Sequence, residues 1–448
     1  MKKKIVIVGA GISGIMAAYV LRLFDLQVEL IIIDAGSSPE LGLHHGATLG
    51  PGRNTRHFTG TEGLSFQNPV HTKLLFEKTS DTSEGWQAIP EHELTQREKN
   101  WRKECVDRYV RDVTPEHNPY DVMYTKLNYG GMAAWEFLTE MQPQLGINQI
   151  NKDHVYVAFA DETSLLKDFA SETLFNPFQD ENPVAQVNLA QIHDNPAGVL
   201  AMDTIYSQLL QLPGSTWRIQ SMWKYIYEFL SKDLLTKFIW DFSVKSTESL
   251  PKADAYVWAN GCGCIVPDIC KEYGRVQGIG GWWITVPNPG FRAPFKFSAP
   301  QPSGYINFTP DGDSLIISGG FGWIGERYYE EVEQLLEPAR QHLLEDVSSL
   351  LKMSTDTFKK FNFEWCIRPT TPTGLPDIAI HTIGDAKHIM ISGAGKAGST
   401  QASILALFVA QQLVSDSKLQ TTLENYNNQK NRKVIQSGLD LLNRGLEP

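Results

Sequence analysis

The sequence predicts an α/β fold in which a parallel sheet, covered on both faces, is interleaved with an antiparallel sheet. Two observations indicate the parallel sheet. Short apolar strands followed by a glycine-rich turn and a helix stand at residues 4–24 and again at residues 388–414. The third observation is a run of strand patterns with hairpin turns at residues 281–319, which is typical of an antiparallel sheet. At roughly 150 residues per domain, the 448 residues predict two or three modules.

The first element is a strand, turn and helix unit. Lys4–Val8 is a short β-branched run without alternation, as expected for a fully buried strand, and a helix is expected from about Ser13 to Phe24. Between them lies a G-x-G-x-x-G pattern. Its first glycine permits a tight turn, its second lets the backbone approach a pyrophosphate, and its third lets the helix pack on the strand. The phosphate-binding residues expected from this pattern are Gly9, Gly11, Ile12, Ser13 and Gly14.

A second buried strand, Val28–Ile33, ends at an acidic residue. Asp34 stands 20 residues beyond Gly14, where a carboxylate can accept hydrogen bonds from the ribose of an adenine dinucleotide. Strand, glycines, helix, strand and acid together predict a Rossmann-like dinucleotide-binding unit. No arginine cluster for a 2′-phosphate surrounds Asp34, so NADP is disfavoured, whereas FAD and NAD both remain open.

The composition narrows the classes of partner and location. The chain carries 40 Lys and Arg against 51 Asp and Glu, a net charge of −11, and no basic block beyond Lys2–Lys4, which argues against a nucleic-acid partner. Residues 5–21 carry no charge, but glycines interrupt this run, so we expect neither a signal peptide nor a transmembrane span. Five cysteines without zinc-type spacing predict no metal site and favour a reducing cytoplasm.

The remaining elements follow from the hydrophobic patterns. A loop rich in Gly, Pro, His and Arg follows Asp34, and residues 72–196 hold helical patches without a clean βαβ unit, which we interpret as inserted substrate-domain structure. The helices expected elsewhere span about residues 128–140, 221–232, 330–351 and 400–414, with a surface helix after residue 415. The expected strands span about residues 237–244, 253–261, 281–287 and 388–392, with two short strands between residues 305 and 319.

Further motifs, together with their order, resemble the D-amino acid oxidase superfamily of flavoproteins, which includes glycine oxidase, sarcosine oxidase and D-amino acid dehydrogenase. His44–Thr48 and Arg53–His57 look like the two halves of a sarcosine oxidase stretch that lies over the flavin, here with four residues inserted between them. Ile367–Pro376 (IRPTTPTGLP) is similar to the family's L-R-P-x-T-P-D-G-x-P, and Ile391–Gly395 with Gly398 resembles its closing glycine-rich flavin turn. With the N-terminal glycines, the resemblance covers the whole chain.

The resemblance implies FAD rather than NAD, and a flavin domain of the Rossmann-like, glutathione reductase type 2 class. It also implies that both domains are discontinuous. The FAD-binding domain is expected to comprise residues 1–75, 196–275 and 363–448. The substrate domain, which caps the isoalloxazine with an antiparallel sheet, is expected to comprise residues 76–195 and 276–362.

By the same resemblance, two arginines are expected to be catalytic. Arg368 is expected to bind the substrate carboxylate, because a guanidinium is a rigid fork that meets a carboxylate in two parallel bonds. Arg56 resembles a sarcosine oxidase position that contacts flavin or substrate. Besides Asp34 and the N-terminal turn, the residues expected to bind the cofactor are His45, Gly46, Ala47, Thr48, Arg53, Cys366, Gly393, Gly395, Lys396, Ala397, Gly398, Ser399 and Thr400.

Cys366 raises the question of a covalent flavin. It stands six residues before Pro372, a spacing that resembles the attachment site of sarcosine-type oxidases. A buried free cysteine is nevertheless common and inert. We therefore favour FAD bound without a covalent bond, with attachment through Cys366 as the alternative.

The chain departs from the sarcosine type at two lysines. A family lysine thought to help oxygen react aligns near Ile316, and a second, which contacts the substrate carboxylate, aligns with Thr400. Lys396 lies four positions from Thr400, and Lys296 is a candidate substitute for the first. The electron acceptor is accordingly left open between oxygen and a quinone or carrier.

The functional hypothesis is an FAD-dependent oxidoreductase that oxidises the CH–NH bond of an amino acid or secondary amine by hydride transfer to flavin N5, giving an imine. The expected substrate is a small amine bearing a carboxylate. Two alternatives remain: oxidation of a hydroxy acid or specialised metabolite on the same scaffold, and a flavin-binding subunit of a larger dehydrogenase. The aromatic residues in the expected capping sheet, half of which should face inward by alternation, are Trp282, Trp283, Tyr305, Phe321 and Trp323.

Overall fold

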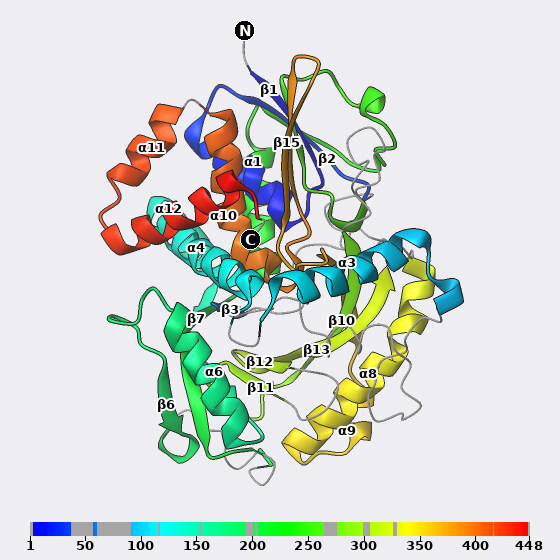
Figure 1. Cartoon of the computed structure of the whole chain (residues 1–448), viewed down its shortest axis with the longest axis vertical. Helices are drawn as coiled ribbons and strands as arrows, with labels where there is room; N and C mark the ends of the chain where they lie inside the picture. Colours follow the sequence, from blue (N-terminus) through cyan, green and yellow to red (C-terminus); the bar gives the residue numbers. More distant parts are fainter. Residues whose placement is uncertain are drawn as a thin grey trace.

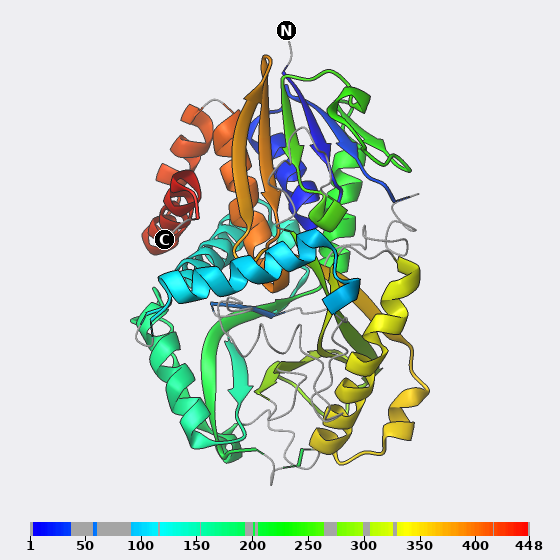
Figure 2. The same cartoon turned by 45° about the vertical axis from the view of Figure 1, so that its right-hand side comes forward.

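The structure is a computed structural model. It describes residues 3–36, 57–60, 91–114, 117–152, 154–192, 200–201, 205–263, 276–298, 305–325, 329–414 and 416–446. The described strands form two sheets of different construction, and helix α3 (Gln96–Asp112) crosses the molecule between them in both views (Figures 1 and 2).

A six-stranded sheet forms the upper part of the molecule in Figure 1. Its neighbouring strands are parallel except for one antiparallel hairpin, β15–β16. The central strands are buried along almost their whole length, as predicted for the first of them. In spatial order the strands are β15 (Asp377–Ile383), β16 (Ala386–Ser392), β9 (Ala255–Trp258), β1 (Lys4–Val8), β2 (Glu29–Ile33) and β8 (Thr236–Ile239).

Helices cover one face of this sheet, where alternate strand residues such as Ile5 and Ile7 join the largest apolar core. Side chains on the other face, such as Val6 and Val8, pack against Leu250 and its neighbours. Helix α10 lies beside α1, and α4 packs against both α10 and α12. The helices in contact here are α1 (Ile12–Phe24), α10 (Gly398–Leu413), α4 (Pro119–Met141), α7 (Ile219–Ser231) and α12 (Gln429–Arg444).

A ten-stranded sheet, mostly antiparallel, forms the lower part of the molecule. Its main path runs in the order β14 (Phe363–Thr370), β10 (Gln277–Pro287), β13 (Ser314–Gly325), β12 (Tyr305–Asp311), β11 (Phe295–Ser298), β5 (His154–Ala158), β7 (Gln208–Trp217) and β3 (His57–Thr59). Strands β4 (Gln149–Asn151) and β6 (Ala185–Asn188) also pair with β7. Helices α8 (Tyr329–Leu351) and α6 (Glu162–Phe175) lie at its two ends, and the short helices α5 (Pro143–Gly146), α9 (Thr355–Lys359) and α11 (Asp416–Glu424) complete the described α-helices.

The two faces of the ten-stranded sheet differ in character. One face carries large apolar side chains, including Trp282, Phe308 and Ile317, which pack with Leu343 and Leu344 of α8. The residues between them point to the opposite face because side chains alternate along a strand. This opposite face carries the polar side chains described below.

The predicted elements are largely found, with differences at three places. Helix α3 was not predicted, because its composition is strongly polar; a capping box between Thr95 and Glu98 starts it. The expected strand 237–244 ends at Ile239, and the chain turns at Asp241, which has a φ of 56°. After residue 415 two helices replace the single surface helix, and Ile435 and Leu439 of α12 are buried.

The expected division into two domains stays a prediction. The six-stranded sheet draws its strands from the three ranges expected for the flavin domain, while β3, β7 and β14, also within those ranges, pair in the ten-stranded sheet. Among the described residues, no helix combines the length and the apolar character needed to cross a membrane.

Candidate active site

The N-terminal glycine turn has the tight geometry that its spacing predicts. Gly9 has a φ of 103°, and its N–H donates to the carbonyl of Ile33 at 2.8 Å, which ties β1 to β2. A Cβ at Gly14 would overlap the carbonyl oxygen of Gly9, so only glycine lets α1 start this close to the strand. A Cβ at Gly11, in contrast, would meet no described atom within 4 Å. The turn thus packs tightly on its protein side and leaves room on the side where a pyrophosphate is expected.

Asp34 lies at the end of β2, next to this turn. One carboxylate oxygen accepts from the N–H of Ala10 at 2.7 Å, and the other accepts from the N–H of Gly36 at 2.7 Å. Burial raises the pKa of Asp34 above its ordinary value, although these two donors act in the opposite direction. A carboxylate has about four lone-pair positions, so Asp34 can hold the turn and still accept a hydrogen bond from a ribose hydroxyl.

The closing glycine turn joins β16 to α10. Gly393 and Gly395 have φ values of 76° and 56°, which glycine adopts without strain. Helix α4 supports the turn from behind: the Tyr124 hydroxyl accepts from the N–H of Ala397 at 3.3 Å, and Trp135 Nε1 donates to the Ser399 carbonyl at 3.0 Å. The first amides and the positive dipole end of α10 are thereby fixed in place, which suits a group that gains negative charge.

The two turns lie at the same edge of the sheet. β1 and β16 both pair with β9 in parallel, so their carboxyl ends point the same way. The end of β9 contacts both turns: a Cβ at Gly9 would run into the Ala259 backbone, and Ser392 Oγ donates to the Gly261 carbonyl at 3.0 Å. The carboxyl edge of a parallel sheet is the usual place for a dinucleotide. The predicted cofactor residues at both ends of the sequence are therefore brought together.

Arg368 lies on β14, with only 8% of its surface exposed. Its Nη1 donates to the Gly280 carbonyl at 3.4 Å, and its guanidinium occupies the space that a Cβ on Gly281 would need. Two residues further along the same strand, Thr370 forms a β-bridge with Ala394 in the closing turn. The ten-stranded sheet thus places the buried guanidinium of Arg368 near the closing glycine turn, where the flavin is predicted to bind.

Helix α3 holds the segment that follows Arg368. Trp101 Nε1 donates to the Thr370 carbonyl at 3.3 Å, and the Cys105 thiol donates to the Pro372 carbonyl at 3.3 Å. Within the segment, the Thr371 hydroxyl donates to the Leu375 carbonyl at 2.6 Å, and Gly374 has a φ of 75°. These contacts explain structurally why the Pro- and Thr-rich motif forms a fixed turn rather than a mobile loop.

The face of the sheet that carries Arg368 is polar and buried. Ser318, Asn307 and Lys296 occupy paired positions on β13, β12 and β11. Thr309, next on this face of β12, makes a 2.9 Å hydrogen bond with His57 Nε2 on β3. Sequence motifs missed this set because no contiguous motif carries it: its members lie on three separate strands, β11, β12 and β13, and only the register of those strands aligns them. The available signal was the alternation of polar and apolar residues within 305–318, which by itself predicts only strands.

Cys366 shares the face of Arg368 and is 8% exposed. It packs in a small apolar cluster with Trp283 and Ile316, the position at which the sarcosine type is expected to carry lysine. Of the five expected aromatic residues, Trp282 points into the apolar core and Trp283 to the polar face. Trp323 packs against Trp101, with ring centroids 4.8 Å apart. The side chains of Tyr305 and Phe321 lie outside the described part of the structure.

Several predicted site residues also lie outside the described residues, so their placement stays a prediction. They are His45, Gly46, Ala47, Thr48, Arg53 and Arg56. Their segment starts after Gly36, beside Asp34, and ends before His57, which contacts the polar face.

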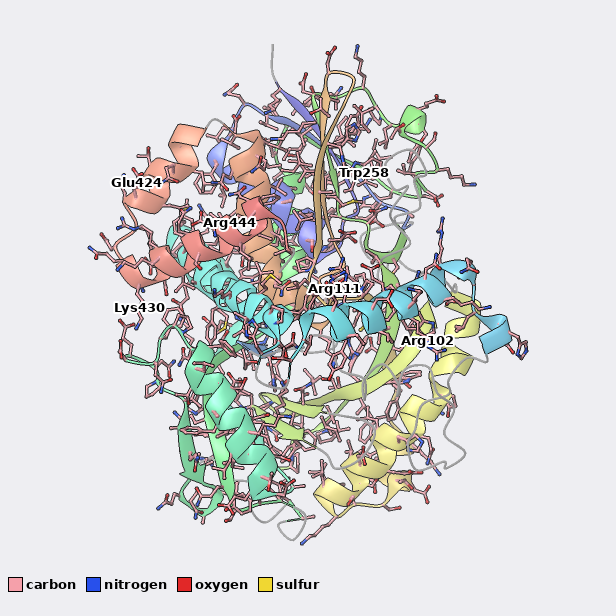
Figure 3. All side chains as sticks on the ribbon, in the orientation of Figure 1. Arg102, Arg111, Trp258, Glu424, Lys430 and Arg444 are labelled. Atoms are coloured by element: carbon pink, nitrogen blue, oxygen red, sulfur yellow. The ribbon has the colours of Figure 1, made fainter. Side chains whose placement is uncertain are left out.

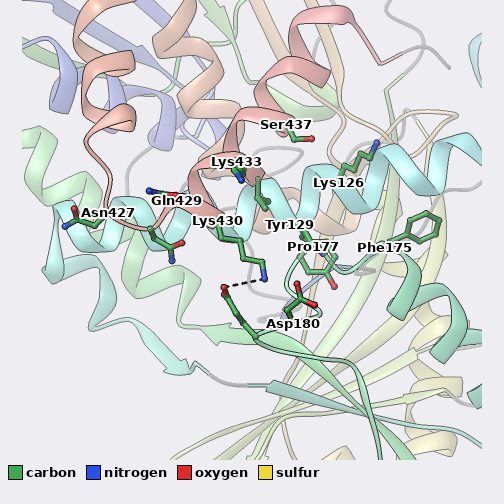
Figure 4. A pocket seen from close by; sticks show the side chains of 13 residues that line it. Lys126, Tyr129, Phe175, Pro177, Asp180, Asn427, Gln429, Lys430, Lys433 and Ser437 are labelled. Atoms are coloured by element: carbon green, nitrogen blue, oxygen red, sulfur yellow. Dashed lines mark ion pairs between the residues drawn. The ribbon is translucent and has the colours of Figure 1, made fainter.

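A separate pocket of about 860 Å³ opens between α4, the start of α12 and the chain after α6 (Figure 4). Lys126, Lys430 and Lys433 line it, and Lys430 pairs with Glu181 at 3.5 Å. None of the predicted site residues lines this pocket. It is thus distinct from the edge at which the two glycine turns meet.

Comparisons with known proteins support the fold. No protein-family model matches the sequence, and no curated protein matches it either. Solved structures do match: glycine oxidase from Geobacillus kaustophilus has a TM-score of 0.56 at 13% identity, covering 94% of this chain and 95% of that one. L-proline dehydrogenase from P. horikoshii has a TM-score of 0.55 at 13% identity, covering 93% and 94%. L-α-glycerophosphate oxidase from Mycoplasma pneumoniae, solved with FAD bound, has a TM-score of 0.54 at 10% identity, covering 92% and 94%.

These similarities confirm the predicted fold. The chain has, over nearly its whole length, the mixed parallel and antiparallel architecture of proteins such as glycine oxidase, as the motif resemblance implied. At 10–13% identity the likeness establishes architecture and leaves the reaction and the substrate to be argued from the site.

Proposed function

We propose that this chain is an FAD-dependent oxidoreductase that oxidises the C–N bond of an amino acid or secondary amine bearing a carboxylate. The observation that carries the proposal is the placement of Arg368, buried on the polar face and two residues from the bridge to the closing glycine turn. A buried guanidinium at this point can hold a carboxylate in two parallel bonds. The carbon next to that carboxylate would then have to face the closing turn, where the flavin ring is expected.

The residues present fit FAD. The space at Gly11 and the N-terminus of α1 suit the pyrophosphate, Asp34 suits the adenosine ribose, and the N-terminus of α10 suits the flavin ring. When bound, FAD supplies the two-electron acceptor that takes a hydride from the carbon bearing the nitrogen, leaving an imine that water hydrolyses. The protein's own part is to orient the substrate through Arg368 and to exclude water with Trp283 and Ile316.

The first test is whether the purified protein, expressed with FAD available, is yellow and loses its colour under anaerobic conditions with a substrate. In a panel of D- and L-amino acids, N-methyl amino acids and hydroxy acids, only compounds with both an amine and a carboxylate should bleach the protein. If hydroxy acids alone bleach it, the substrate is a hydroxy acid and the amine proposal is wrong. Binding of FAD without bleaching by any member would favour a flavin-binding subunit.

Arg368→Leu tests the assigned carboxylate contact. We expect KM for carboxylate substrates to rise about 10- to 100-fold, equivalent to about 1.4 to 2.8 kcal/mol, with FAD still bound. Arg292, an exposed arginine that precedes β11, provides the matched control: Arg292→Leu should leave the kinetics unchanged. Equal KM values in Arg368→Leu and the parent would refute the assignment.

The mode of attachment and the electron acceptor follow from two further measurements. Cys366 lies in an apolar cluster, so we propose non-covalent FAD, and acid precipitation should leave all the colour in the supernatant. Colour in the pellet that disappears in Cys366→Ser would establish covalent attachment instead. The bleached protein is then mixed with oxygen or with a soluble quinone. The compound that restores the flavin colour faster is identified as the electron acceptor.

A further inference from the structure

A buried row of side chains crosses the polar face of the ten-stranded sheet. Lys296 on β11 pairs with Asn307 on β12, Asn307 pairs with Ser318 on β13, and Ser318 pairs with Trp283 on β10. Residues directly opposite one another on neighbouring strands share a face. Each of these four side chains is 5% exposed or less. The row therefore connects a buried ammonium group to the tryptophan beside Cys366.

The guanidinium of Arg368 leans toward this row. Arg368 pairs with Ile279, yet its Nη atoms lie over Gly281, the next residue on the same face of β10. Trp283, the residue after Gly281 on this face, already belongs to the row. Three strand intervals of about 4.8 Å separate β10 from β11, which places their backbones about 14 Å apart. The long side chain of Lys296 can span part of this distance. The two cationic groups therefore lie on the same buried face of the sheet, a few strand intervals apart.

Two apolar side chains, Cys366 and Trp283, lie on this face between Arg368 and the polar part of the row, and they belong to one cluster. At the Lys296 end, Asn307 and Ser318 add an amide and a hydroxyl that can donate hydrogen bonds. The complementary ligand has an anionic group at each end and a short aliphatic middle.

We propose that Lys296 is a specificity-determining residue that binds a second substrate carboxylate, so that the substrate class is small amines with two carboxylates. Acidic α-amino acids and N-(carboxyalkyl) amino acids belong to this class. The inference rests on the proposed function, since Arg368 is taken to hold the first carboxylate. A carboxylate held by an ammonium and neutral donors in a buried site interacts more strongly than it does in water.

Pairs of substrates that differ only in the second carboxylate test the proposal: iminodiacetate against sarcosine, and glutamate against glutamine in both stereochemical forms. For the FAD-loaded protein we expect kcat/KM to be at least about tenfold higher for the diacid of a productive pair. Lys296→Gln should erase this preference by raising KM for the diacid alone, and Lys296→Arg should retain it. Lys296→Glu should reverse the preference. Lys237, an exposed strand lysine on β8, gives the matched control: Lys237→Gln should change nothing.

A binding measurement separates this inference from the proposed oxidation. Iminodiacetate should raise the thermal midpoint of the FAD-loaded parent more than sarcosine does, and Lys296→Gln should lose that difference. If the shift occurs but no amine bleaches the flavin, the oxidation proposal fails and the diacid site stands. If monoacids are bound and oxidised as well as diacids, or if Lys296→Gln weakens both members of a pair equally, the diacid site is wrong and the oxidation proposal stands.

Discussion

The two sheets of this protein carry their functional groups in different places. In the six-stranded sheet the central strands are buried on both faces, and the candidate cofactor groups lie beyond their carboxyl ends, in the turns at Gly9–Gly14 and Gly393–Gly398. In the ten-stranded sheet the candidate substrate groups lie in the middle of strands, on one face. One sheet therefore presents backbone amides at an edge, and the other presents side chains across a surface.

This difference follows from how each sheet is covered. A parallel sheet packed on both faces has no free face for polar side chains, so its ligand-binding groups lie in the loops at its carboxyl edge. An antiparallel sheet can pack one face on a core and leave the other for a ligand. Trp258, labelled in Figure 3, illustrates the first case: its side chain is fully buried, and its Nε1 donates to His388 Nδ1 at 3.2 Å. Thr309 illustrates the second, with its hydroxyl on the polar face.

The largest expected effect contrasts the two faces of β12. Phe308 is fully buried in the apolar core, with its ring 4.9 Å from that of Phe297 and 5.1 Å from that of Phe291. Phe308→Ala should lower the free energy of unfolding by about 3–5 kcal/mol, the usual cost of such a cavity. The next residue belongs to the polar face, and Thr309→Val should cost only about 1 kcal/mol through the lost hydrogen bond to His57.

Chemical denaturation of both variants checks this contrast, with kinetics measured on the folded fraction. Phe308→Ala should keep the parent KM where it remains folded, because its side chain faces away from the site. A larger loss of stability in Thr309→Val than in Phe308→Ala would show that the polar face, and not the apolar one, supports the sheet.

The second prediction contrasts two glycines of the same turn. Gly14→Ala places a methyl group on the Gly9 carbonyl and should cost about 1–3 kcal/mol of stability as overpacking, with or without FAD. Gly11→Ala meets no described atom within 4 Å and should leave the apoprotein as stable as the parent. It should nevertheless weaken FAD binding at least about tenfold, equivalent to 1.4 kcal/mol, if the pyrophosphate occupies that space.

Thermal unfolding of the apoproteins and FAD titration by fluorescence quenching separate the two effects. Full FAD affinity in Gly11→Ala would place the pyrophosphate elsewhere. Unchanged stability in Gly14→Ala would mean that α1 can shift away from β1 without cost.

The same contrast explains what the sequence could predict. The candidate dinucleotide-binding edge could be proposed from the sequence because its residues are contiguous in the chain: the three glycines and Asp34 stand at fixed spacing around one helix. Arg368 was predicted as a candidate site residue from a contiguous motif as well. Asn307, Ser318 and Lys296 were not found as a set, because only the register of three separate strands brings them together. Helix α3 was missed because its polar composition hides the few residues, such as Trp101, with which it packs.

A smaller effect on kinetics is expected at Gly281, over which the long side chain of Arg368 lies. A Cβ at Gly281 would overlap the Arg368 guanidinium. Because the guanidinium is the end of a flexible side chain, Gly281→Ala should displace it with little loss of stability. We expect KM for carboxylate substrates to rise by about tenfold, equivalent to about 1.4 kcal/mol, with kcat changing less. Gly146→Ala, where the added methyl meets only ordinary contacts, is the control. Parent-like kinetics in Gly281→Ala would show that the guanidinium position does not set carboxylate affinity.

The smallest expected effect is a pH dependence that belongs to the six-stranded sheet. Burial, reinforced by His381, lowers the pKa of His388 below its ordinary value of 6.5. The unfolded chain therefore binds a proton at a higher pH than the folded chain does, so stability should fall as the pH drops below about 6.5. Protonation of Nδ1 would also remove the acceptor used by Trp258. Replacing His388 with Gln should lower stability at neutral pH but flatten its decline between about pH 6.5 and 5. The exposed His381, which pairs with His388 across the hairpin, supplies the control: His381→Gln should retain most of the decline in stability. If stability falls equally steeply with pH in the His388 variant and in the parent, other groups cause the decline.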